Sequence, residues 1–129
     1  MAYNFHSKYY SRKCEYDGRT FDSKREKDRY IQLRLWEEAG LIKDLQCQVK
    51  YIIFPTVREP DTIGPRGGVR PGKIIEKEAA YFADFVYTDC TTGQTVVEDV
   101  KSPATRTPEY ILKRKGMLAQ HGIKIKEVM

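Results

Sequence analysis

The chain has 129 residues, of which 40% are hydrophobic and 12% aromatic, so it is long and apolar enough for one folded domain and is not a disordered tail. No apolar run approaches the roughly 18 residues of a membrane span, and residues 1–6 lack a signal-peptide core, so we expect a cytoplasmic protein without membrane contact. The 23 basic and 18 acidic side chains leave a formal charge of +5, which weakly favours a polyanionic partner.

The first segment, residues 1–20, is polar and aromatic without a clear period, and we expect an N-terminal arm or irregular segment there. A single domain follows over residues 21–129. Ser23 and Glu26 form a capping-box pattern, in which the serine caps the helix and the glutamate occupies its third position. The apolar spacing that follows predicts a helix that continues to about Ala39 and is stopped by Gly40.

The middle of the chain combines a strand with a long irregular stretch. Residues 45–54 are rich in Val, Ile, Tyr and Phe and predict the first strand. Residues 55–73 contain four prolines and four glycines, so we expect a loop without regular elements. A loop of that length in a small domain indicates either function or disorder.

The C-terminal half predicts a hairpin, a helix and a last strand. A turn at residues 91–93 separates two apolar runs, which predicts an antiparallel pair of strands. Thr107 followed by proline is a typical helix start. The predicted elements are strands at 79–88 and 94–101, a helix from Pro108 to about Gln120, and a strand at 123–128. The predicted order is therefore α-β-β-β-α-β, an α/β fold.

Two acids lie inside the strands of the predicted hairpin. Asp84 is flanked by apolar residues in one strand, and Asp99 in the other, with Lys101 two positions further on. Since side chains alternate along a strand with a period of two, Asp99 and Lys101 share a face and Glu98 points to the opposite one. If the two faces coincide in the hairpin, Asp84 and Asp99 converge.

Converging carboxylates have two interpretations. Oxygen ligands suit Mg²⁺ or Mn²⁺, and such an ion activates water and stabilises charge on a phosphate. A lysine beside the ion can position or deprotonate that water, or hold the phosphate. Asp99 and Lys101 fit equally well a structural ion pair at the end of a sheet, because an Asp-x-Lys pattern is very short. Spacing alone leaves both interpretations open.

The whole pattern resembles the PD-(D/E)xK, or restriction-endonuclease-like, nuclease superfamily. It is closest to a phage and prophage group of small nucleases related to Holliday-junction resolvases. The similarity extends from about residue 16 to the C-terminus and rests on Ser23-Lys24-Arg25-Glu26, Asp84-Phe85-Val86-Tyr87 and Glu98-Asp99-Val100-Lys101. Ala83 replaces the proline of the superfamily name, a position at which members vary.

The resemblance implies a restriction-endonuclease-like core with a mixed central sheet flanked by helices. It implies that Asp84 and Asp99 bind the metal, that Lys101 is catalytic, and that Glu26 is a third acid. Glu26 also has a purely structural explanation, because its capping-box position lets its side chain bond the Ser23 amide. Gln48, in the first strand, either lines this site or is a satisfied buried amide.

Basic side chains surround the predicted site along the chain. Those at the start of the first helix, in the loop and in the second helix are candidates for contacts with a DNA backbone, although a solvated surface explains them equally well. The candidates are Lys24, Arg66, Arg70, Lys73, Lys113, Arg114 and Lys115.

The sequence therefore predicts a small endonuclease, dependent on Mg²⁺ or Mn²⁺, that hydrolyses DNA phosphodiesters. The resemblance favours a branched substrate and a role in phage recombination, replication or packaging inside a bacterial host cell. A homodimer is expected if two strands must be cut. The main alternative is a phage accessory protein that binds DNA without cleaving it, and a third is a phage protein that binds another protein.

Overall fold

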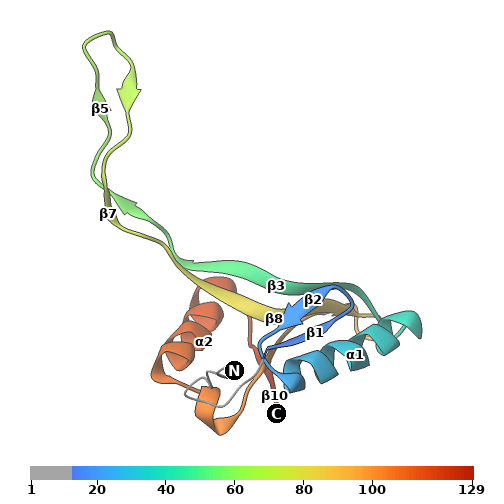
Figure 1. Ribbon diagram of the computed structural model, residues 1–129. Coiled ribbons are helices and arrows are strands. Elements are labelled where there is room, and N and C mark those ends of the chain that lie inside the picture. The colour runs from blue at the N-terminus through green and yellow to red at the C-terminus, as the bar shows by residue number, and fades with distance from the viewer. Residues whose placement is uncertain (1–12) are drawn as a thin grey trace, which may run out of the picture.

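The central sheet has four strands in the order β10-β9-β8-β3 in the computed structural model, which describes residues 13–129 (Figure 1). Its strands are β3 (Ile42–Phe54), β8 (Ala79–Asp89), β9 (Thr95–Val100) and β10 (Lys126–Val128). β3, β8 and β9 pair antiparallel, whereas β10 runs parallel to β9. The sheet is therefore mixed, which confirms the predicted α/β class.

Two helices pack on this sheet, α1 (Lys24–Glu38) and α2 (Pro108–His121), with a short 3-10 turn, η1 (Pro103–Thr105), before α2. The side chain of Ser23 caps α1 and that of Thr107 caps α2, each accepting a backbone N–H of the first turn. Gly122 ends α2 with a left-handed φ of 65°. Neither helix of the described chain is long and apolar enough to cross a membrane.

Alternate residues of β9 contribute to different cores. One core forms beneath α1 from Tyr30, Leu33 and Phe85, and Val96 and Val100 pack against it. The other forms beside α2 from Tyr110, Met117 and Ile53, together with Val97. The period of two along β9 thus divides its side chains between the two helices. Burial of each large apolar side chain contributes about 1.5–3 kcal/mol to the stability of the folded state.

A small hairpin precedes α1, where the sequence predicted an irregular segment. β1 (Cys14–Tyr16) pairs antiparallel with β2 (Arg19–Phe21). Phe21 is buried, and its ring centroid lies 5.1 Å from that of Tyr30 in α1. The hairpin therefore belongs to the α1 core, and the rest of the predicted arm, residues 1–12, lies outside the described residues.

The prediction that residues 55–73 have no regular structure was wrong. They form most of a two-stranded ribbon that projects from the ends of β3 and β8 (Figure 1). Its strands are β4 (Val57–Arg58), β5 (Thr62–Ile63), β6 (Val69–Arg70) and β7 (Ile74–Glu76). A proline removes only its own N–H from the hydrogen-bond ladder, so short paired stretches can form between the prolines. A prediction based on composition alone misses these stretches.

Candidate functional site

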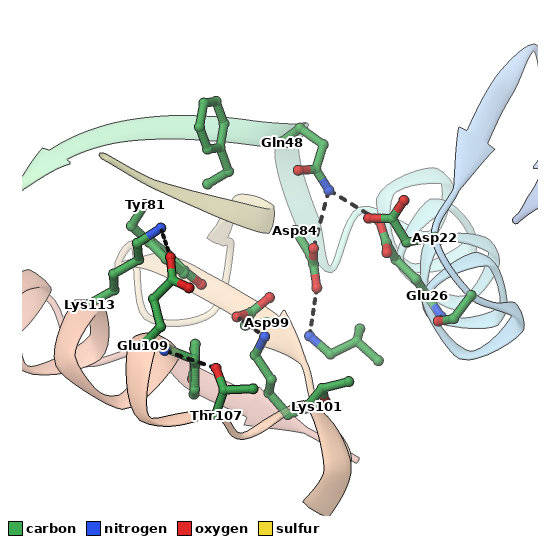
Figure 2. Close-up of a pocket in the computed structure, with 15 residues that line it drawn as sticks. Asp22, Glu26, Gln48, Tyr81, Asp84, Asp99, Lys101, Thr107, Glu109 and Lys113 are labelled. Carbon is green, nitrogen blue, oxygen red and sulfur yellow. Dashed lines mark hydrogen bonds and ion pairs between the residues drawn. The ribbon is translucent and has the colours of Figure 1, made fainter. Parts of the chain in front are cut away.

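The hairpin of β8 and β9 brings two predicted acids together. Phe85 pairs with Glu98 in the antiparallel register, which sets Asp84 opposite Asp99 one step along the ladder. Both line a pocket of about 380 Å³, which also receives side chains from α1, β3 and α2 (Figure 2). The convergence predicted from strand parity is therefore present.

Asp84 is held by two hydrogen bonds. Its Oδ2 accepts the Val100 backbone N–H at 2.8 Å, and its Oδ1 accepts Nε2–H of Gln48 at 3.2 Å (Figure 2). The first bond fixes this carboxylate against the end of β9. The second links it to the neighbouring strand β3, so both oxygens have defined positions before any ligand binds.

Glu26 reaches the same pocket from the first turn of α1. Its side chain is buried, and its Oε1 accepts Nε2–H of Gln48 at 3.2 Å, so one amide bridges Glu26 and Asp84. Gln48 has a left-handed φ of 53°, an unfavourable conformation for a non-glycine residue inside a strand. Gln48 lines the pocket and is exposed, so it is not the buried amide of the alternative.

The carboxyl groups of the pocket carry more negative charge than their surroundings neutralise. Burial raises the pKa of Asp84 far above its usual range, and hydrogen bonding and charge repulsion from Asp99 raise it further. Burial and the charge of Asp22 raise the pKa of Glu26 to about 7. A proton or a divalent cation would relieve this repulsion.

Asp99 is buried and pairs with the lysine predicted beside it. Nζ of Lys101 lies 3.1 Å from Oδ2 of Asp99 and 4.1 Å from the ring centroid of Tyr110 in α2. A carboxylate and an aromatic face both favour a positive charge, so Lys101 sits in the pocket as an ammonium. It is thereby placed to hold a phosphate oxygen or to orient water.

The donor set suits a hard divalent cation, because the three acids offer only oxygen ligands. Within residues 13–129, however, no three acidic, histidine or cysteine side chains stand close enough together to ligate one metal ion. The Gln48 amide lies between Glu26 and Asp84, and the Lys101 ammonium occupies the open side of Asp99. A metal ion bound to Asp84 and Asp99 would thus share these carboxylates with the Gln48 amide and the Lys101 ammonium.

Glu98 lies on the opposite face of β9, as strand parity predicted. Its carboxylate is fully buried and accepts two hydrogen bonds from Arg29 of α1, both at 2.8 Å, and one from the Tyr87 hydroxyl. The Arg29 guanidinium also lies over the Trp36 ring, 4.9 Å from its centroid. Glu98 is therefore a structural anion that fastens α1 to the sheet, and not a ligand of the pocket.

The predicted basic residues occupy four places. Lys113 lines the pocket, where its Nζ lies 3.2 Å from Oε1 of Glu109. Arg114 bonds Glu127 of β10 at 2.8 Å and so fastens α2 to the sheet. Lys24 and Lys115 are exposed on α1 and α2 outside the pocket lining. The remaining three, Arg66, Arg70 and Lys73, are exposed on the ribbon.

Sequence reasoning missed several pocket residues. Asp22 adds a fourth acid just before α1, and its position four residues before Glu26 was a usable signal. Tyr81 and Tyr110 line the pocket, and within the described chain their buried hydroxyls have no hydrogen-bond partner. Burial raises the pKa of both phenols, and the charge of Asp99 raises it further, so both remain potential donors.

Comparison with known proteins identifies a family without a described activity. A sequence model of the family described as "Protein of unknown function (DUF1064)" matches residues 6–128, nearly the whole chain. No curated protein and no solved structure matches the chain.

Proposed function

The chain belongs to this family of proteins of unknown function, and from the geometry of its acidic pocket we propose that it is a metal-dependent DNA endonuclease. The observation that carries the proposal is the meeting of Asp84, Asp99 and Lys101 with Glu26 in one pocket. We propose in addition that the order of α1, β3, β8, β9, α2 and β10 is the core of the PD-(D/E)xK superfamily.

Asp84 and Asp99 would hold Mg²⁺ or Mn²⁺, and Glu26 would bind it directly or through water. Such an ion, when bound, supplies an activated water and stabilises charge on the phosphate. Burial, together with the neighbouring acids, raises the pKa values of Asp84 and Glu26, and this supports the assignment because a bound cation would stabilise the ionised carboxylates.

Lys101 would orient the attacking water and hold a phosphate oxygen through its ammonium. In the hydrolysis, the water oxygen bonds to phosphorus, the bond from phosphorus to one sugar oxygen breaks, and that oxygen takes up a proton. The Asp99 carboxylate at 3.1 Å and the Tyr110 ring hold the ammonium in place, which supports a positioning role for both. Gln48 would hold Glu26 and Asp84 in register while the metal site is empty.

The test is cleavage of plasmid, single-stranded and four-way-junction DNA by the purified protein with Mg²⁺, Mn²⁺ or EDTA. We expect cutting with either metal, none with EDTA, and faster cutting of the junction than of linear duplex. The Lys101→Ala variant should cut more slowly, and equal rates would remove the role assigned to the lysine. DNA binding without cleavage under every metal condition would contradict the nuclease and favour the accessory DNA-binding protein.

A further inference from the structure

The ribbon of residues 55–78 reaches far from the pocket. Each of its two sides has 12 residues, which at about 3.3 Å per residue extend up to roughly 40 Å from the sheet. Figure 1 shows this arm beyond the ends of β3 and β8, with no helix beside it. Side chains at the tip are therefore too far away to contact the acidic pocket of the same molecule.

Specific contacts hold the two sides of the ribbon together. The Glu59 N–H donates to the Lys73 carbonyl at 2.8 Å, and the Gly72 N–H donates to Oδ1 of Asp61 at 2.9 Å. A Cβ at Gly72 would lie 1.7 Å from the Glu59 carbonyl oxygen, so only glycine permits this close approach. The middle of the arm thus has a defined conformation and is not an irregular solvated loop.

The tip of the arm is a turn that displays Arg66. The Gly67 N–H donates to the Gly64 carbonyl at 3.0 Å, with Pro65 and Arg66 as the two central residues. Gly67 has a left-handed φ of 81°, which returns the chain into β6. Proline presets the turn, and Arg66 is thereby presented at the end of the ribbon.

Charge is segregated along the arm. All its acids, Glu59, Asp61, Glu76 and Glu78, lie nearer the sheet than the pair of β5 and β6, and among them Asp61 bonds Gly72 and Glu78 pairs with Lys50 at 2.8 Å. The outer segment, residues 62–70, contains two cations, Arg66 and Arg70, and no acid, whereas Lys73 lies opposite Glu59. An exposed group of cations without counter-charges on a narrow ribbon is complementary to a polyanion.

Two apolar side chains accompany the cations at the tip. Ile63 and Val69 are paired across β5 and β6 and are 79% and 68% exposed. A two-stranded ribbon fits the groove of duplex DNA, and apolar residues at such tips contact base edges and sugars there. The combination of width, charge and apolar pair therefore points to a duplex and not to a flexible single strand.

We propose that the outer segment of the ribbon, residues 62–70, is a second DNA contact that holds duplex about one helical turn or more from the acidic pocket. Arg66 and Arg70 contact phosphates, and Ile63 and Val69 lie against the groove. The inference rests on the proposed function, because it adds a distant hold on the DNA that the pocket would cut. A second copy of the chain is disfavoured as the occupant of this tip, because two such tips repel each other.

The test measures binding without cleavage, by fluorescence anisotropy in EDTA, to labelled duplexes of about 8 and about 24 base pairs. Three proteins are compared: wild type, Arg66→Gln/Arg70→Gln, and a matched control, Lys43→Gln/Lys126→Gln, which removes two exposed lysines of the central sheet. At about 0.1 M salt we expect the arm variant to lose roughly 10- to 60-fold in affinity for the long duplex and little for the short one. Its salt slope should fall by about two, while the control binds as wild type does.

Equal binding of the arm variant and wild type to the long duplex would overturn the inference, as would an equal loss on both lengths or no DNA binding by wild type. Sedimentation of wild type and the arm variant tests whether the tip binds a second copy of the chain. A wild-type dimer that dissociates in the variant would show that the tip is a dimer contact and would overturn the inference. If binding depends on the arm but the protein cuts no DNA, the proposed nuclease function is wrong and the proposed DNA contact of the arm stands. If the protein cuts DNA and the arm variant binds as wild type does, the nuclease function stands and the DNA contact of the arm is wrong.

Discussion

The two faces of β9 carry adjacent buried acids in opposite situations. Glu98 receives three hydrogen bonds from Arg29 and Tyr87 and has no contact with the pocket. Asp99 has the Lys101 ammonium beside it and faces Asp84 across the ladder. A buried carboxylate with all its hydrogen bonds satisfied stabilises a fold, whereas one that shares a pocket with other acids is left available to a ligand.

The largest expected effect tests Asp99 as a site residue. Under the proposed function, Asp99→Asn removes a metal ligand, and cleavage in Mg²⁺ should fall by about 10³-fold or more, equivalent to about 4 kcal/mol. Glu98→Gln is the matched control on the opposite face, and its cleavage rate per folded molecule should stay within a few fold of wild type. Single-turnover rates on a four-way junction measure both, and similar losses in both variants would erase the distinction between the faces.

The next effect tests Glu98 as a structural anion. Glu98→Ala leaves the Arg29 guanidinium, whose side chain is only 11% exposed, without its partner, and should lower the free energy of unfolding by about 3–5 kcal/mol. Asp99→Asn should change that free energy by less than about 1 kcal/mol or raise it, because it removes repulsion from Asp84. Urea denaturation followed by circular dichroism measures both, and a larger loss in Asp99→Asn would reverse the assignment of the two faces.

The pH dependence of the free energy of unfolding should come from the acids of the pocket. Glu26 has a pKa of about 7 in the folded protein against 4.5 as its usual value, so between these values the folded state binds more protons than the unfolded state. The contribution of Glu26 to the stability of the metal-free protein should therefore be fully present below pH 4.5 and fall by about 3 kcal/mol as the pH rises through 7. Asp84 acts in the same direction.

Glu26→Gln provides the control for this pH dependence. In this variant the loss of stability between pH 4.5 and 7 should become distinctly smaller, and Mg²⁺ should reduce it in wild type by neutralising the carboxylates. Thermal melts across that pH range, with Mg²⁺ and with EDTA, record the effect. An equal decline in both proteins would show that Glu26 is not the titrating group.

The smallest expected effect concerns the buried phenol of Tyr81. Its hydroxyl has no partner within residues 13–129, so Tyr81→Phe should raise the free energy of unfolding by about 1 kcal/mol. If the hydroxyl donates to a bound phosphate, cleavage should fall several fold in the same variant. If Tyr81→Phe gains stability and cuts DNA as fast as wild type does, Tyr81 only packs in the pocket wall.

Local rules in the sequence predicted much of this arrangement. The caps Ser23 and Thr107 were predictable because capping depends on neighbouring residues alone. The separation of Glu98 from Asp99 followed from the alternation of a strand, and it required no knowledge of what either acid contacts. The ribbon was missed because prolines and glycines indicate turns by composition, whereas pairing depends on which N–H groups remain and on the close approach at Gly72.

By itself the sequence determined the order of the two helices and the four strands of the central sheet, the helix ends and the face on which each acid of β9 lies, because these depend on residues near one another in the chain. The tertiary structure alone decided that Gln48 bridges Glu26 and Asp84, that Asp22 and two tyrosines join the pocket, and that Arg29 neutralises Glu98. Those contacts join positions 22 to 69 residues apart, and their geometry follows from sheet register and helix packing.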